Sequence, residues 1–286
     1  MLLTSVSFVS LFSFPIIHST LPYAVSKFLN FSEMKTFLAL AVLCFITLTV
    51  AAQGPPIITD KPIMVGEKRI IFKTLTRVEV REDVRFFNAP FMTHYVIKPN
   101  LLVAAHIPLA GVNHFKHKHK QTGLGDLSVQ MKYQFFRWDE SRKTARAALK
   151  VQQFFPTGFD SHNYEISIGE WQTFAGLTFG YEALRYGLGA NVGYHYVANR
   201  SDFFHYKISA GLPLMPLVYP PKQINLYFEY DGEVNLETGA HNLFLAQGIQ
   251  YAIKRITFET AIKIPLIQNG TDQQKYTLLF GTRFII

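Results

Sequence analysis

The most constraining feature of this sequence is a strict two-residue alternation that follows a glycine-rich loop. Residues 123–126 (Gly-Leu-Gly-Asp) end the loop, and from residue 127 to 135 every odd position is apolar and every even position is polar. Successive side chains of a β-strand point to opposite faces, so this segment predicts a strand with one apolar and one polar face. Such a strand fits a soluble sandwich with a buried apolar face. It also fits a membrane barrel whose apolar face contacts lipid.

The same alternation recurs along the chain after residue 69, and no segment shows helical periodicity for long. Most of these runs are close to the length of about ten residues that a tilted membrane strand needs. We expect about twelve strands, at residues 69–80, 89–98, 100–108, 124–136, 144–155, 170–181, 184–197, 203–213, 222–233, 240–252, 255–265 and 275–285.

The polar faces of these strands decide between the two architectures. In residues 222–233 that face carries acidic side chains such as Glu229, and in residues 184–197 it carries mostly glycines. A soluble barrel packs its inward face with apolar groups. An outer-membrane barrel turns its apolar face to lipid and keeps a polar interior. The sequence therefore predicts an all-β fold, a transmembrane antiparallel β-barrel over residues 69–286.

Composition agrees with a membrane barrel. Charged residues make up 17% of the chain, against about a quarter in soluble domains. The 26 phenylalanines and 14 tyrosines suit strands and the aromatic girdles of such barrels. The net charge of +8 suggests nucleic acid as a partner, but the basic residues are scattered, so no nucleic-acid binding is expected. The single cysteine, Cys44, lies in an N-terminal apolar run, which excludes a disulfide framework.

The N-terminal residues predict targeting rather than structure. A basic start at Met34 precedes apolar residues 37–50 and a small-residue cleavage region, which together predict a cleaved signal peptide at 34–52. We expect residues 1–33 to be a gene-model extension, with an unusually long leader as the alternative. Residues 53–68 are Pro-rich and aperiodic, and we expect a periplasmic lead-in there.

Connection lengths should alternate between short periplasmic turns and longer outer loops if the N-terminus is periplasmic. Two connections break this alternation, because 214–221 is long for a turn and 234–239 is short for a loop. Turns are expected at 99–100, 137–143, 182–183 and 253–254, and outer loops at 110–123, 156–169 and 267–274.

An ordered set of short motifs resembles one family of outer-membrane barrels, the "MetA-pathway of phenol degradation" transporters. The resemblance covers about residues 90–285. Its motifs are His106-Ile107-Pro108-Leu109, Gly123-Leu124-Gly125-Asp126-Leu127, Lys132-Tyr133-Gln134-Phe135, Phe155-Pro156-Thr157-Gly158 and Gly193-Tyr194-His195-Tyr196.

This resemblance implies a barrel in the outer membrane of a Gram-negative bacterium, acting as a channel for small, often hydrophobic or aromatic, compounds. Such a barrel is expected to contact outer-membrane lipid and lipopolysaccharide and to be inserted by the barrel-assembly machinery. The cleavage region resembles leaders that are common in Bacteroidetes. No cofactor is expected.

Charged and imidazole side chains on the polar faces are the candidate lumen and selectivity residues. Rings of charge set ion selectivity in pores. The same side chains could instead form salt bridges that close a barrel only modestly wider than side chains can fill. The candidates are Lys132, Lys150, His195, His205, Lys207, Glu229, Asp231, Glu233, Glu259 and Lys263.

Three closely spaced imidazoles, His114, His117 and His119, form the weak metal-binding candidate of the sequence, because imidazole binds Zn, Cu and Ni. The lysines between them would repel a cation. A solvated basic loop that contacts lipopolysaccharide phosphates is therefore the favoured interpretation.

Three functions from different classes remain open. The first is a channel or transporter for passive passage of small molecules, and the second is a plugged barrel with a structural or surface-binding role. The third is a barrel lipid hydrolase, which would need a Ser/His pair such as Ser209 and His205. No Gly-x-Ser-x-Gly elbow occurs, so an enzyme is not expected. A soluble secreted β-protein is the alternative to all three.

Overall fold

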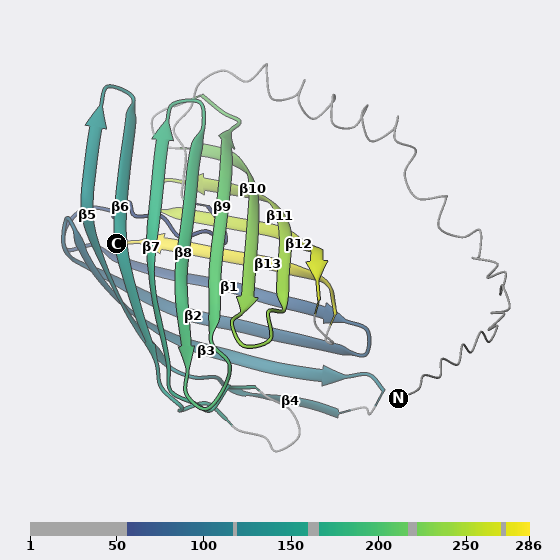
Figure 1. Cartoon of the computed structure of the whole chain (residues 1–286). Coiled ribbons are helices and arrows are strands. Elements are labelled where there is room, and N and C mark those ends of the chain that lie inside the picture. The colour runs from purple at the N-terminus through teal and green to yellow at the C-terminus, as the bar shows by residue number, and fades with distance from the viewer. Residues whose placement is uncertain (1–55, 117–118, 160–165, 217–221, 270–272) are drawn as a thin grey trace, which may run out of the picture. The chain divides into compact units, whose positions relative to one another are not determined.

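The computed structural model describes residues 56–116, 119–159, 166–216, 222–269 and 273–286, and these residues form strands and their connections (Figure 1). None of them belongs to a helix long and apolar enough to cross a membrane. The predicted extension and signal peptide, residues 1–52, lie outside the described residues.

Within the described ranges, thirteen strands form one antiparallel sheet. They are β1 (Ile70–Arg81), β2 (Val84–Lys98), β3 (Leu101–His114), β4 (His119–Leu124), β5 (Ser128–Glu140), β6 (Lys143–Phe154), β7 (Gln172–Ala183), β8 (Gly187–Val197), β9 (Phe203–Pro213), β10 (Lys222–Asn235), β11 (His241–Ile253), β12 (Ile256–Gln268) and β13 (Gln274–Ile285).

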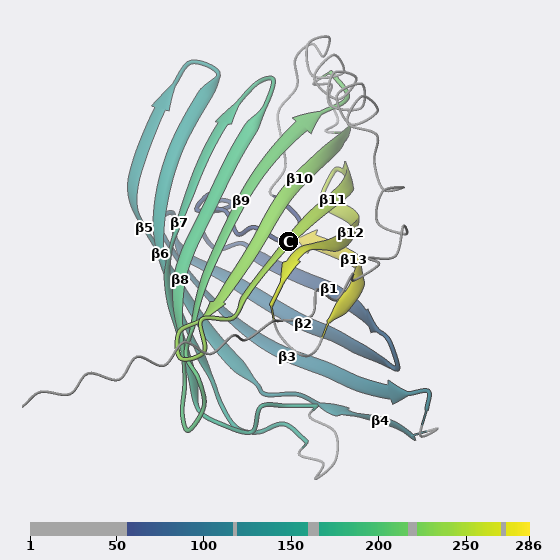
Figure 2. The ribbon, with the colours of Figure 1, turned by 45° about the vertical axis from the view of Figure 1, so that its right-hand side comes forward.

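Strand β3 closes the sheet into a barrel. One edge of β3 pairs with β2, and its other edge pairs with β5 over residues 101–106 and with β4 over residues 109–114. Strands β4 and β5 therefore occupy one position in the ring, while β1 pairs with β13. The result is a closed ring of twelve strand positions, as predicted, in which β5 to β9 face β1 to β3 across the barrel (Figure 2).

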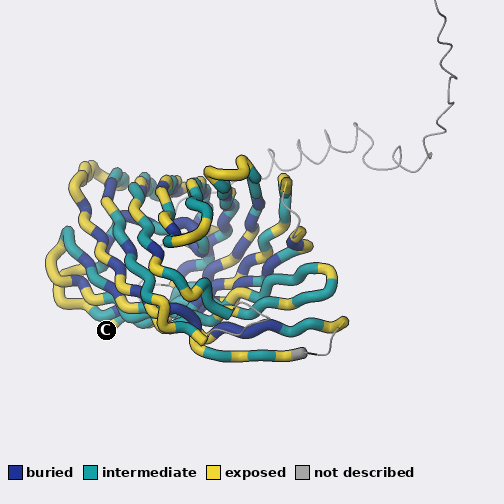
Figure 3. The backbone as a smooth tube through the Cα atoms, turned by 60° about the horizontal axis from the view of Figure 1, so that its bottom comes forward, coloured by how far each residue is buried: buried dark blue, intermediate teal, exposed yellow. Residues whose placement is uncertain are grey.

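Side-chain exposure alternates along the strands (Figure 3). In β5 the even-numbered polar residues from 128 to 134 are buried, whereas the odd-numbered apolar residues from 129 to 135 are 44–53% exposed. Rows of exposed large apolar residues on a closed sheet are the lipid-facing surface of an outer-membrane-type barrel. The predicted arrangement, with the apolar face outside and the polar face inside, is confirmed.

Two predicted connections are largely strand. The outer loop expected at 110–123 is a hairpin in which β3 and β4 stay paired, and the turn expected at 137–143 shortens to residues 141–142. In β5 a bulge between Gln134 and Phe136 shifts the alternation by one residue. The alternation in the sequence therefore did not predict where that strand ends. Most residues near the tip of the β3–β4 hairpin are polar, so the sequence there shows no apolar alternation that would predict a strand.

Three of the motifs that resemble the MetA-pathway family, residues 106–109, 123–127 and 155–158, meet in space at one end of the barrel. The Gly125 N–H donates to the carbonyl of Pro108 at 2.8 Å, and the Leu127 N–H donates to the Thr157 hydroxyl at 3.0 Å. Motifs separated in the sequence therefore form one corner, where β3, β5 and the start of the β6–β7 connection join.

Asp126 organises the long connection between β6 and β7. Its carboxylate accepts hydrogen bonds from the backbone N–H groups of Gly158 at 3.0 Å, Ile168 at 3.0 Å and Gly169 at 3.2 Å. A Cβ at position 158 would lie 2.3 Å from the side chain of Ser167, so only glycine fits there. The aspartate of the Gly-Leu-Gly-Asp motif thus holds a loop rather than lining the lumen.

We predict that Asp126→Ala loosens the β6–β7 connection without opening the barrel. Three N–H groups lose a charged acceptor, and loss of even one such bond would raise the open population of the loop about tenfold or more. Limited proteolysis should cut within residues 155–171 correspondingly faster, while heat-modifiable gel migration stays unchanged. Asp139→Ala, which removes an exposed carboxylate at the other end of β5, is the control. Equal cleavage of the two variants would contradict this role.

Candidate functional site

Residues 56–65, the inner segment, precede β1 and pack against inward-facing side chains of the barrel. They belong to the segment predicted as a periplasmic lead-in. Six of the ten residues of the inner segment are buried, including Ile57 at 1% exposure. Two apolar clusters hold it, one of Ile57 with Leu75, Tyr227, Ala261 and Leu279, and one of Met64 with Val96, Leu102 and Ala104.

Glu229 of β10 anchors the tip of the inner segment. Its carboxylate accepts hydrogen bonds from three consecutive backbone N–H groups, those of Ile57 at 2.8 Å, Ile58 at 3.1 Å and Thr59 at 2.6 Å. The side chain is 2% exposed, and a carboxylate buried to that degree is costly unless it is hydrogen-bonded. Glu229 and the inner segment therefore stabilise each other.

Asp60 makes the second polar anchor, in the middle of the barrel. Its carboxylate lies 2.5 Å from Nζ of Lys132 and 3.7 Å from Nζ of Lys150, and its backbone N–H donates to the Asn191 side chain at 2.7 Å. Burial by itself raises the pKa of the Asp60 carboxyl, but the two lysines outweigh burial and hold the pKa below its ordinary value. The contact is therefore fully present at neutral pH and is lost only as pH falls below the usual carboxyl range.

The barrel wall is shaped to fit the inner segment. A Cβ at Gly180 would lie 2.9 Å from the ring of Pro62, and one at Gly248 would lie 2.3 Å from the side chain of Ile57. Lys61 is 5% exposed and pairs with Glu182 of β7 at 2.5 Å. Glycines within strands commonly mark close approach of another chain segment, and here that segment is the N-terminal part of the same chain.

Two further ionic clusters line the interior wall. Asp231 lies 3.1 Å from Nζ of Lys207 and 3.1 Å from Nζ of Lys263, and Glu259 lies 3.2 Å from Arg283. All of the predicted lumen candidates point inward. Each one contacts the inner segment, lines a cavity or pairs with another inward-facing group. Their position is thus established, while their role in selectivity stays a prediction.

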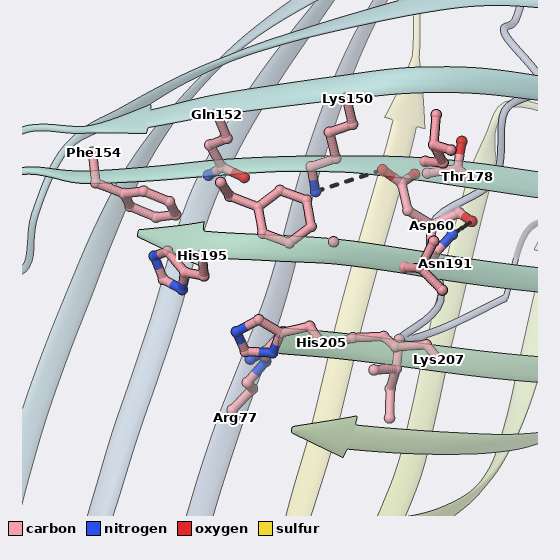
Figure 4. Close-up of a pocket in the computed structure, with 15 residues that line it drawn as sticks. Asp60, Arg77, Lys150, Gln152, Phe154, Thr178, Asn191, His195, His205 and Lys207 are labelled. Atoms are coloured by element: carbon pink, nitrogen blue, oxygen red, sulfur yellow. Dashed lines mark hydrogen bonds and ion pairs between the residues drawn. The ribbon is translucent and has the colours of Figure 1, made fainter. Parts of the chain in front are cut away.

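Two cavities are lined by interior wall residues, and the first of them also borders the inner segment. The first has a volume of about 230 Å³ (Figure 4). It is bounded by the inner segment at Asp60, by inward-facing residues of β6 to β9, and by Arg77 of β1. The second, of about 220 Å³, is strongly polar and is lined by Glu79, Arg81, Asp231, Glu233, Asn242, Phe244, Lys263, Gln268 and Gln274.

Sequence reasoning missed several of these residues. Asp60 lies in an aperiodic segment, where no pattern places a side chain inside the barrel. Lys73 and Arg77 could have been found, because they share the parity of the buried residues Ile71 and Leu75 in β1. The same alternation rule that identified the other lumen residues therefore extends to this strand.

Neither the metal candidate nor the hydrolase candidate gains support. Among the described residues, no group of three or more His, Cys, Asp or Glu side chains could hold a metal ion. His117 lies outside those residues, and the side chain of His119 is not described, so the predicted metal site is untested. Ser209 and His205 are not hydrogen-bonded to each other, and the Ser209 hydroxyl has no partner in the described part of the chain.

The closed ring of twelve strand positions described above agrees with the comparisons with known proteins. A family model described as "Putative MetA-pathway of phenol degradation" matches residues 61–254. The chain belongs to this family. The resemblance inferred from the short motifs is thereby confirmed, and the match covers most of the MetA-pathway barrel as well as the end of the inner segment. No curated protein sequence matches the chain significantly.

One solved structure shows the same fold. The COG4313 outer membrane channel from Pseudomonas putida F1 aligns with a TM-score of 0.61 and 9% identity, over 82% of this chain and 100% of that one. The NanC porin and the KdgM porin align with TM-scores of 0.48 and 0.46 and identities of 10% and 7%. They cover 75% and 74% of this chain and 98% of each of theirs. At such low identity, the first likeness establishes the barrel fold alone.

We predict that Glu229→Gln releases the tip of the inner segment. A glutamine has one acceptor oxygen and places an N–H₂ group where a second acceptor is needed, so charge-assisted bonds to Ile57, Ile58 and Thr59 are lost. Each such bond is typically worth about 1.5–3 kcal/mol, enough to raise exposure of the tip tenfold or more. Maleimide labelling of Ile58→Cys in a Cys44→Ser background measures that exposure.

The matched control is Glu237→Gln, which changes a glutamate in the β10–β11 connection, away from the inner segment. That variant should label at the same rate as the parent. Equal labelling rates in the Glu229 and Glu237 variants would show that the carboxylate does not hold the inner segment.

Proposed function

We propose that this chain is an outer-membrane channel for passive passage of small, hydrophobic or aromatic, compounds. The observation that carries the proposal is the charged inner wall, which borders cavities of about 230 and 220 Å³. A barrel built only for structure has no need of mixed charge and open volume in its interior, whereas charged linings are how pores discriminate among solutes.

The outer surface supports a location in the outer membrane of a Gram-negative bacterium. Outward positions carry large apolar residues that are about half exposed, such as Phe91, Met131, Ile208, Ile249 and Phe258. Lipid is the solvent that makes such a surface favourable, and a closed barrel leaves no unpaired strand edge in it. Contact with lipopolysaccharide and insertion by the barrel-assembly machinery follow from this location and are part of the proposal.

The lumen candidates divide into two roles in this proposal. Glu229 and Lys132 hold the inner segment, which narrows the passage. Lys207, Asp231 and Lys263 stand on the wall away from its anchors and border the two cavities, where they would act on a passing solute. Selectivity is therefore assigned to this second group.

A plugged barrel is the second candidate function, and a specific observation favours it. The inner segment is held by three backbone hydrogen bonds to Glu229 and by the Asp60–Lys132 pair at 2.5 Å. If the inner segment never leaves, the barrel would serve as a structural or surface-binding element of the membrane.

Single-channel conductance in a planar bilayer distinguishes the two functions. We expect the refolded chain to give stable current steps, and Asp231→Asn to shift ion preference toward anions because it removes a negative charge between Lys207 and Lys263. Asp83→Asn, which changes a carboxylate in the β1–β2 connection, should leave the preference unchanged. A folded barrel that conducts only after Glu229→Gln would support the plugged barrel, and no current in either form would exclude the channel.

A further inference from the structure

The larger cavity has an aromatic corner in an otherwise polar wall. Phe154 and His195 have ring centroids 5.6 Å apart, and His195 and His205 have centroids 5.5 Å apart. Phe174 meets His205 edge-on, at 6.2 Å and 61°. A Cβ at Gly193 would lie 2.3 Å from the Phe174 ring, so the neighbouring strand leaves room for that ring inside the barrel. The corner presents ring faces and edges suited to a planar aromatic group.

Polar nitrogens without partners lie around the same corner. Nε2 of His195 and Nε2 of His205 are buried and have no hydrogen-bond partner among the described residues. Buried polar atoms of native proteins are nearly always hydrogen-bonded, so each exception calls for an explanation. Two such atoms on adjacent rings in one cavity suit a ligand that carries hydrogen-bond acceptors.

Arg77 differs from the other cations of this cavity. Lys150 lies 3.7 Å from Asp60, and Lys207 lies 3.1 Å from Asp231. Arg77 makes no direct hydrogen bond or ion pair in the described ranges, and Asp231 attracts it at longer range. The lining holds three cationic side chains, Arg77, Lys150 and Lys207, against one carboxylate, that of Asp60, which leaves a net charge of +2. A guanidinium that makes no direct ion pair, on a lining with more cations than carboxylates, favours a carboxylate or phenolate group.

The volume of the cavity limits the size of this ligand. A dry apolar cavity of about 150 Å³ accepts one benzene molecule. A volume of about 230 Å³ therefore holds one aromatic ring and a carboxylate. Water can occupy the remainder, since each molecule takes about 30 Å³.

We propose that this cavity is a binding site for a small single-ring aromatic anion, of which benzoate is the simplest carboxylate. The ring packs on Phe154, Phe174 and the two imidazoles, and the carboxylate is bound by Arg77 and the histidine nitrogens. The inference rests on the proposed function, since a solute has to enter the barrel. It names the class of compound that the channel selects.

Equilibrium binding of benzoate to the full chain in detergent, by isothermal titration calorimetry, tests the proposal. Benzoate should bind saturably. Arg77→Gln should weaken binding by about tenfold or more because a charge-assisted contact is lost. Phe174→Leu should weaken it by roughly two- to tenfold because an aromatic contact is lost. Cyclohexanecarboxylate and benzyl alcohol, which lack the ring or the charge, should bind more weakly than benzoate.

Matched controls use the same substitutions outside the cavity. Arg185→Gln changes an exposed arginine in the β7–β8 connection, and Phe179→Leu changes an outward-facing phenylalanine of the same strand as Phe174. Both should bind benzoate like the parent. Heat-modifiable gel migration verifies that each variant is folded, and if Arg77→Gln fails to fold, the comparison of Phe174→Leu with Phe179→Leu decides.

Two results would overturn the proposal, namely no saturable benzoate binding by the folded parent, or equal affinity in a cavity variant and its control. Binding in detergent requires no transport. Binding without conductance would therefore uphold the site and remove the channel, whereas conductance without binding would do the reverse.

Discussion

Ring closure by strand β3 is the constraint on which the rest of the structure depends. In lipid no water can satisfy a free strand edge, so a membrane sheet has to pair every edge within itself. Strand β3 achieves this by pairing with β2 on one side and with β5 and β4 in succession on the other. Once the ring is closed, the two-residue alternation separates every strand into a lipid face and an interior face, and the charges that pair across the lumen lie on the interior face.

The interior charge is balanced in two different ways. Some groups pair across the wall, as Asp231 does with Lys207 and Lys263. Others are satisfied by the inner segment, which brings backbone N–H groups to Glu229 and a carboxylate to Lys132. Because the inner segment supplies both hydrogen-bond donors and a carboxylate, it can satisfy interior charges that the barrel wall leaves unpaired. Arg77 borders the first cavity without a direct ion pair among the described residues.

The barrel could be predicted because each strand carries the period-two alternation in its own sequence. The strand predicted at residues 203–213, for example, begins and ends at the same residues in the structure. The prediction failed at 110–123, where the paired residues 113–114 and 119–122 are all polar. The interior candidates were predicted solely from their odd or even positions within each strand. The inner segment could not be found this way, because its contacts depend on where the closed ring places Glu229 and Gly180, and no local pattern in a Pro-rich segment encodes a partner so far along the chain.

The anchor of the inner segment has a consequence for the order of folding. Ile57 and the Glu229 carboxylate that binds it are 172 residues apart in sequence. Contacts of such separation carry a large loop-closure entropy and form only after the intervening chain is ordered. The part of the barrel that leaves the ribosome first is therefore among the last to reach its final place, and nine strands, with their turns, have to be ordered before β10 can receive it.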